Sequence, residues 1–127
     1  MGTGGKKLVV LAVDDSPVTL NSVNAVLNGK YKVYTLLHPM ELQKTLKRLT
    51  PDLFLLDYKM PEINGFDLIP VIRSIEAHKD TPIIFLTSEG TMINVTMAIA
   101  LGACDFIVKP FEPANLREKV ARHISKA

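Results

Sequence analysis

The chain has 127 residues, which is enough for one domain with its own buried core, so we expect no second domain. Hydrophobic residues make up 47% and charged residues 22%, a composition that excludes a disordered or fibrous protein. The formal net charge of +2 is too small to favour nucleic acid or a membrane surface as the main partner.

The hydrophobic pattern, the single cysteine and the N-terminal residues limit where the protein can be located and how far its domain extends. No apolar run approaches the roughly 18 residues of a membrane-spanning helix and no signal peptide is visible, so we expect a cytoplasmic protein. Cys104 cannot form an internal disulfide, and we expect it to be a small buried hydrophobe. We expect residues 1–7 to be a flexible N-terminus or a cloning remnant, and residues 8–127 to be the domain.

Five short apolar runs alternate with longer segments of helical pattern, which predicts repeated strand-helix units and a parallel sheet. The last three runs are nearly continuous in hydrophobic residues, as expected when helices cover both faces of the sheet. The predicted strands are Leu8–Val13, Tyr31–Leu36, Asp52–Leu56, Ile83–Leu86 and Cys104–Val108.

Start and stop signals define the helices between these runs. Ser16 as a cap, followed by Pro17, predicts the start of the first helix, and Asn28-Gly29 predicts its end. In the third helix, Pro70 would remove a backbone hydrogen bond and clash one turn back, so we expect a kink or a later start. The second to fifth helices are predicted over residues 39–49, 65–77, 91–101 and 113–125.

This alternation predicts an α/β fold with a doubly wound, five-stranded parallel sheet and helices on both faces. In such sheets, ligands bind at the carboxyl ends of the strands, so polar residues there are candidate site residues. They are Asp14 and Asp15 after the first strand, Asp57 after the third, Thr87 after the fourth and Lys109 after the fifth.

Each of these residues alone has a structural explanation, such as a helix cap, a turn or a solvated charge. We call the set of five residues at the carboxyl ends of the strands the rim. Its three carboxylates would repel one another unless a cation lay between them, and ligands that are all oxygen favour Mg²⁺. Mg²⁺ usually keeps positions for water and phosphate oxygens, so the rim suits phosphoryl transfer with a carboxylate as nucleophile. Lys109 would then supply a point charge and Thr87 a hydroxyl donor.

From Leu8 to Ser125 the sequence closely resembles the receiver domains of response regulators, which belong to two-component signalling and phosphorelays. The resemblance implies a flavodoxin-like strand order, 2-1-3-4-5. The segments that carry it are Val13-Asp14-Asp15-Ser16, Leu56-Asp57-Tyr58-Lys59-Met60-Pro61, Asn64-Gly65, Leu86-Thr87-Ser88, Gly102-Ala103 and Val108-Lys109-Pro110-Phe111.

The resemblance also implies a phosphoprotein that signals by changing shape and catalyses only its own phosphorylation and dephosphorylation. Asp57 would accept the phosphoryl group from a histidine kinase or a histidine phosphotransfer protein, forming an aspartyl phosphate. Thr87 and Lys109 would bind the phosphoryl oxygens, and the bond between Lys109 and Pro110 would be cis. The implied ligands of Mg²⁺ are the carboxylates of Asp14, Asp15 and Asp57 and the backbone carbonyl of Lys59.

The resemblance further implies a switch, in which the threonine after the fourth strand moves and an aromatic residue of the fifth strand turns inward. Phe106 is the matching residue, although plain core packing explains it equally well. Because Phe106 has no hydroxyl, its switch would depend on packing alone. Lys59 and Glu89 should flank the phosphorylation site, and we expect both to change the dephosphorylation rate, in a direction the sequence does not define.

The predicted fourth helix has no charged residue between positions 91 and 102. We expect Val95, Ala98 and Ile99 to form an apolar stripe that faces the sheet. With the fifth strand and fifth helix, this helix is predicted to bind a downstream target or a second copy, although scattered exposed apolar residues are also common. The residues expected on this output face are Met92, Ile93 and Met97.

Three other functions fit the sequence less well than that of a receiver domain. A magnesium-dependent phosphohydrolase of the haloacid dehalogenase kind needs a second aspartate two residues after its nucleophile, where this chain has Lys59. A flavin-binding flavodoxin needs a phosphate cradle after the first strand, where two aspartates would repel the phosphate. An interaction module that is not phosphorylated has no need for all five rim residues.

The sequence has three histidines, which we expect at the surface and outside the rim. They are His38, His78 and His123.

Overall fold

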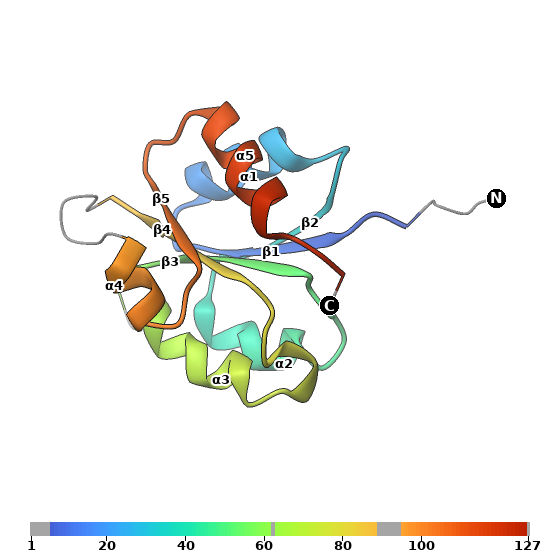
Figure 1. Ribbon diagram of the computed structural model, residues 1–127, viewed down its shortest axis with the longest axis vertical. Helices are drawn as coiled ribbons and strands as arrows, with labels where there is room; N and C mark the ends of the chain where they lie inside the picture. The colour runs from blue at the N-terminus through green and yellow to red at the C-terminus, as the bar shows by residue number, and fades with distance from the viewer. Residues whose placement is uncertain (1–5, 62, 89–94, 127) are drawn as a thin grey trace.

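The computed structural model describes residues 6–61, 63–88 and 95–126. Its centre is a parallel sheet of five strands in the order β2-β1-β3-β4-β5, which confirms the predicted order (Figure 1). Each strand lies within one residue of its predicted bounds. The strands are β1 (Val9–Val13), β2 (Lys32–Leu36), β3 (Leu53–Asp57), β4 (Ile83–Thr87) and β5 (Asp105–Val108).

Helices cover both faces of the sheet (Figure 1). On one face lie α1 (Pro17–Leu27) and α5 (Pro113–His123), and on the other lie α2 (Leu42–Thr45), α3 (Ile69–Arg73) and α4 (Val95–Ala100). Three 3₁₀ turns complete the described elements: η1 (Pro39–Glu41), η2 (Gly65–Leu68) and η3 (Glu76–His78). None of the described helices is long and apolar enough to cross a bilayer.

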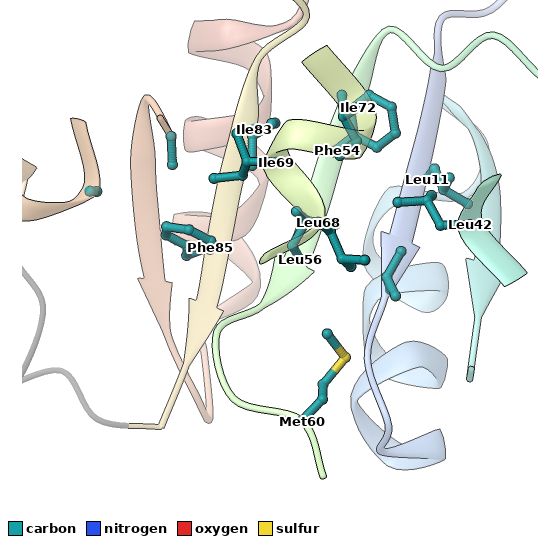
Figure 2. Packing of buried hydrophobic residues seen from close by; sticks show 13 residues of the cluster. Leu11, Leu42, Phe54, Leu56, Met60, Leu68, Ile69, Ile72, Ile83 and Phe85 are labelled. Carbon is teal, nitrogen blue, oxygen red and sulfur yellow. The ribbon is translucent and has the colours of Figure 1, made fainter. Parts of the chain in front are cut away.

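Two hydrophobic clusters, one on each face, hold the helices to the sheet. All five residues of β3 and of β4 are buried, as their continuous apolar sequences predict. Figure 2 shows one cluster, in which Leu11, Phe54 and Ile83 of three strands pack with Ile69 and Ile72 of α3. Each such side chain contributes about 1.5–3 kcal/mol when it is fully buried. These clusters therefore fix the strand ends at which the polar residues stand.

The signals at the ends of α1 are confirmed. Oγ of Ser16 accepts a hydrogen bond from the backbone N–H of Thr19 at 3.3 Å, and Pro17 occupies the first turn, where its missing N–H is not needed. Gly29 follows the helix with a φ of +102°, a conformation that glycine adopts without strain. The entry to α1 is thus well defined immediately after Asp14 and Asp15.

The second helix is much shorter than the predicted range of 39–49. It begins as the 3₁₀ turn η1, continues for four residues as α2, and then tightens again. The N–H of Lys47 bonds to the carbonyl of Lys44 at 3.2 Å and that of Arg48 to Thr45 at 3.0 Å. These bonds span three residues, whereas the N–H of Leu49 bonds to Thr45 at 3.0 Å over four, so the segment after Thr45 continues as irregular turns.

The third helix begins later than its first predicted residue, as the position of Pro70 led us to expect. The 3₁₀ turn η2 precedes α3, and Pro70 lies in the first turn of α3, where no intrahelical bond is lost.

α5 ends at His123, two residues before its predicted end. The half-buried Cys104 lies one residue before β5 and not inside it.

The fourth helix is described only from residue 95, so Met92 and Ile93 lie outside the described residues. Ala98 is fully buried, as predicted, but Ile99 is 60% exposed, so the prediction that Ile99 faces the sheet is wrong. Successive helical residues are rotated by about 100°, and with Ala98 against the sheet Ile99 is carried toward solvent. Met97 is 41% exposed.

The surface position predicted for His78 is also wrong. His78 is 1% exposed, its Nδ1 lies 2.8 Å from Oγ1 of Thr81, and its ring meets the ring of Phe54 edge-on. The turn after α3 folds back under β3 and carries His78 inward, which local sequence does not indicate. His38 is exposed, and His123 is half-buried.

Candidate functional site

The predicted site residues stand at the carboxyl ends of four neighbouring strands. Asp57 and Thr87 are the last residues of β3 and β4, while Asp14 and Asp15 follow β1 and Lys109 follows β5. Asp14, Asp57 and Thr87 are buried, whereas Asp15 is exposed. The rim is therefore a set of buried polar groups with one carboxylate open to solvent.

Asp14 is held by both the loop after β1 and a neighbouring strand. Its Oδ1 accepts a hydrogen bond from the backbone N–H of Ser16 at 2.9 Å, and its own N–H donates to the carbonyl of Leu36 at 3.1 Å. Its Oδ2 lies 3.1 Å from Nζ of Lys109. Because Asp14 is fully buried, these contacts keep its carboxylate in one orientation.

Asp57 is a buried carboxylate in a crowded negative environment. Its Oδ1 accepts from the backbone N–H of Lys59 at 3.3 Å and lies 3.3 Å from Nζ of Lys109. Burial, followed by the negative charge of Asp14, raises the pKa of the Asp57 carboxyl to about 7, although Lys109 lowers it. Without a further cation, this group binds a proton far more readily than an ordinary aspartate.

Lys109 reaches the rim from the far edge of the sheet. Its backbone N–H donates to the carbonyl of Thr87 at 2.7 Å, and its bond to Pro110 is cis. Burial lowers the pKa of Lys109, but the charges of Asp14 and Asp57 outweigh that effect and raise it above its ordinary value. The Lys109 ammonium is therefore a fixed positive charge beside both carboxylates.

The donor set fits a hard divalent cation. One carboxylate oxygen from each of Asp14, Asp15 and Asp57 lies within 4.8 Å of the other two. Lys109 offsets one of these three negative charges, which leaves an excess of two when all are ionised. All three donors are oxygens and one carboxylate is open to solvent, which suits an ion that keeps water and phosphate oxygens among its ligands.

Comparison with known proteins agrees with this geometry. The family model of the response regulator receiver domain matches residues 10–121. The chain belongs to this family. It is a receiver domain of the two-component type, as the sequence resemblance predicted.

The receiver is similar to stand-alone and to larger regulators. It is 35% identical over 114 residues to the chemotaxis protein CheY1 of Helicobacter pylori, a match that covers 87% of this chain and 92% of CheY1. It is 30% identical over 118 residues to the DNA-binding response regulator MtrA of Mycolicibacterium smegmatis, covering 92% of this chain and 50% of MtrA. The chain thus spans about half the length of MtrA, and 18% of the protein RcaC of Microchaete diplosiphon.

Solved structures show the same fold. The chemotaxis response regulator CheY4 of Vibrio cholerae superposes with a TM-score of 0.84 and 31% identity, covering 94% of this chain and all of CheY4. The receiver domain of the sensor histidine kinase PA1611 of Pseudomonas aeruginosa has a TM-score of 0.80 and 26% identity, covering 92% and 97%. In that structure, a magnesium ion is coordinated in the active-site cleft.

Gly65 is a further residue of the receiver site, and sequence reasoning gave it no role. Its N–H donates to the carbonyl of Tyr58 at 2.9 Å, and a methyl group in place of its hydrogen would collide with the backbone carbonyl of Asp57. Only glycine lets the loop after β3 return so close to the backbone of Asp57. The Asn64-Gly65 pair in the sequence was the available signal.

The remaining predicted residues lie around the rim. Lys59 is exposed two residues after Asp57, while its predicted companion Glu89 lies outside the described residues. Phe106 is half-buried in β5 and packs against the cluster that contains Ala98. The structure thus describes the surroundings of Phe106, and its role as a switch stays a prediction.

Proposed function

We propose that this receiver accepts a phosphoryl group on Asp57 from a histidine kinase or a histidine phosphotransfer protein. The observation that carries the proposal is the position of the Lys109 ammonium, 3.1 Å from Asp14 and 3.3 Å from Asp57, beside three clustered carboxylates. A half-buried cation and a surplus of carboxylates are what a site needs in order to bind both a divalent ion and phosphoryl oxygens.

The transfer would be an in-line displacement. A carboxylate oxygen of Asp57 forms a bond to phosphorus while the bond from phosphorus to the donor atom breaks, and the donor leaves with that electron pair. Mg²⁺, held by Asp14, Asp15, Asp57 and the backbone carbonyl of Lys59, would supply the positive charge that keeps the nucleophile ionised and neutralises phosphoryl oxygens. Lys109 and Thr87 would bind the other oxygens of the transferred group.

Intact mass after incubation with acetyl phosphate, with and without Mg²⁺, tests the proposal. We expect a magnesium-dependent gain of one phosphoryl group in the wild type and in Asp80→Asn, a control at an exposed aspartate. Asp57→Asn should show no gain. A wild type that stays unlabelled, under conditions that label CheY1, would instead favour an interaction module that is not phosphorylated.

We also propose that phosphorylation acts on an output face formed by α4, β5 and α5. The exposure of Met97, at 41%, and of Ile99, at 60%, on a helix without charged residues supports this proposal. The partner would be a downstream target or a second copy of the chain. A well-folded Met97→Asp variant with unchanged self-association and target binding would contradict it.

The dephosphorylation rate should depend on Lys59 and Glu89, which lie two residues after Asp57 and Thr87, respectively. Lys59 is exposed immediately beside the site, where a side chain can influence the access of water. Decay of the labelled mass in Lys59→Ala and Glu89→Ala measures this effect. Two variants with the wild-type decay rate would exclude it.

A further inference from the structure

Lys119 of α5 makes two contacts with Phe106, the β5 residue that would act as the switch, and one with its neighbour Asp105. Its Nζ donates to the backbone carbonyl of Phe106 at 2.7 Å and to Oδ1 of Asp105 at 3.0 Å. The same ammonium lies 5.0 Å from the centre of the Phe106 ring, within the range of a cation–π contact. Because the Lys119 side chain is only 19% exposed, solvent screens these contacts weakly.

Asp105 holds Lys119 in this place. It is buried, its Oδ1 also accepts from the N–H of Phe106 at 2.8 Å, and its Oδ2 lies 3.0 Å from Nε2 of His123. Both backbone groups of Phe106 thus bond to the Asp105–Lys119 pair. β5 is an edge strand, so two side chains satisfy the peptide groups that another strand would otherwise bond.

These contacts bridge the two faces of the sheet. The ring of Phe106 packs against the cluster that includes Ala98 of α4, whereas Lys119 belongs to α5 on the opposite face. A movement of the ring away from the Lys119 ammonium would break this cation–π contact. We propose that Lys119 is a positioning residue that holds Phe106 where it lies here and so sets how readily its ring moves on phosphorylation. This inference rests on the proposed function of Asp57.

Three variants separate this role from simple structural support. Lys119→Met keeps most of the side-chain stem and removes the ammonium, while His123 continues to bond Asp105. Lys119→Arg restores a cation that can stack on the ring and donate hydrogen bonds. Arg117→Met, at an exposed position of the same helix, controls for the loss of one positive charge.

The measurement is the NMR signal of the Phe106 ring, assigned with Phe106→Leu, during titration with beryllofluoride and Mg²⁺ as a phosphoryl mimic. Without the mimic, we expect the ring signals of Lys119→Met to lie part of the way toward their position in the saturated wild type. The beryllofluoride concentration at half-saturation should fall about fivefold, a typical size for coupling between two sites. Lys119→Arg and Arg117→Met should behave as the wild type does.

The two proposals fail in different ways. If wild-type Asp57 accepts neither acetyl phosphate nor beryllofluoride, the proposed function fails and this inference fails with it. If the wild type is labelled but Lys119→Met has wild-type ring signals and half-saturation, the proposed function stands and the role of Lys119 is excluded. A loss of unfolding free energy without a change in either readout would show that Lys119 is structural only.

Discussion

The Nζ atom of Lys109 lies 3.1 Å from Oδ2 of Asp14, although the two residues are 95 positions apart in the sequence. Both stand at the carboxyl ends of strands, so the parallel sheet places them at the same edge, and the long Lys109 side chain spans the ends of β3 and β4, which lie between β1 and β5. One ammonium cannot neutralise three carboxylates, and the remaining negative charge makes the site costly for the folded chain. The first two predictions follow from this imbalance.

Asp57→Asn should make the metal-free protein more stable at pH 8. The pKa of Asp57 is about 7 in the folded chain, above the ordinary 3.8, so folding disfavours the ionised carboxylate. This penalty is absent below pH 3.8, grows as the pH rises from 3.8 to 7, and is complete above pH 7. We expect the variant to gain about 1–3 kcal/mol in unfolding free energy at pH 8, from the free-energy value of a pKa shift.

Urea unfolding with EDTA at pH 5 and pH 8 measures this gain. It should be clearly smaller at pH 5, where the carboxyl of Asp57 is mostly protonated in the folded state. Asp80→Asn, at an exposed position, should change little at either pH. A wild type that is more stable than Asp57→Asn at pH 8 would show that the contact with Lys109 outweighs the repulsion from Asp14.

Mg²⁺ should stabilise the wild type by occupying the excess of negative charge. At ten times its dissociation constant, a ligand that binds only the folded chain adds about 1.4 kcal/mol to the unfolding free energy. Asp14→Asn and Asp57→Asn should each lose most of this gain, because each removes one of the clustered carboxylates. Urea unfolding with MgCl₂, compared with NaCl at equal ionic strength, makes the measurement. An equal gain in all three proteins would mean that the ion binds elsewhere.

The sheet and the rim were predictable because their signals are local and strong. Short continuous apolar runs such as β3 and β4 are typical of strands covered on both faces, and the residue that follows each run then lies at a strand end. Asp57 and Thr87 were placed in this way, and charge repulsion then indicated the cation. Family resemblance added individual roles, which the geometry alone does not assign.

The elements that could not be predicted depend on contacts made only after folding. The burial of His78 results from a turn that returns beneath β3, and the exposure of Ile99 depends on how α4 is rotated against the sheet. α2 ends early, at Thr45, because hydrogen bonds that span three residues interrupt the four-residue pattern after it. Likewise, the hydrogen bond from Lys119 to the carbonyl of Phe106 forms only when α5 and β5 are packed together.

Gly65→Ala should damage the site more than its small size suggests. The added methyl group would collide with the backbone carbonyl of Asp57, which lies in the buried strand β3 and has little freedom to shift. We expect a loss of about 2–4 kcal/mol in unfolding free energy, in the range for overpacking a rigid site. If Asp57 is phosphorylated as proposed, its reaction with acetyl phosphate should slow at least tenfold, because Asp57 or its loop must move.

Gly29→Ala is the matched control for this experiment. Gly29 has a φ of +102°, so alanine there is strained, but an added methyl group would meet nothing within 4 Å. It should cost about 1 kcal/mol through backbone strain and leave the phosphorylation rate unchanged. If Gly65→Ala and Gly29→Ala are phosphorylated at the same rate, the close approach of Gly65 to Asp57 has no functional importance.

His78 should make the protein less stable as the pH falls below neutrality. Burial, together with the charge of Arg73, lowers the pKa of His78 below its ordinary 6.5, although Asp52 opposes this effect. In the unfolded chain His78 is therefore protonated near pH 6.5, whereas in the folded chain it stays neutral at that pH. Stability from this group is complete above pH 6.5 and is lost progressively as the pH falls below that value.

The test must be made in Asp57→Asn, because Asp57 gives the metal-free wild type the opposite pH dependence over this range. In that background, adding His78→Gln should flatten the decline in unfolding free energy between pH 7 and pH 5. Glutamine keeps a polar group near Thr81, the partner of His78 at 2.8 Å. His38→Gln, at an exposed position, should leave the decline as it is. Equal slopes in the two histidine variants would mean that another group controls stability over this pH range.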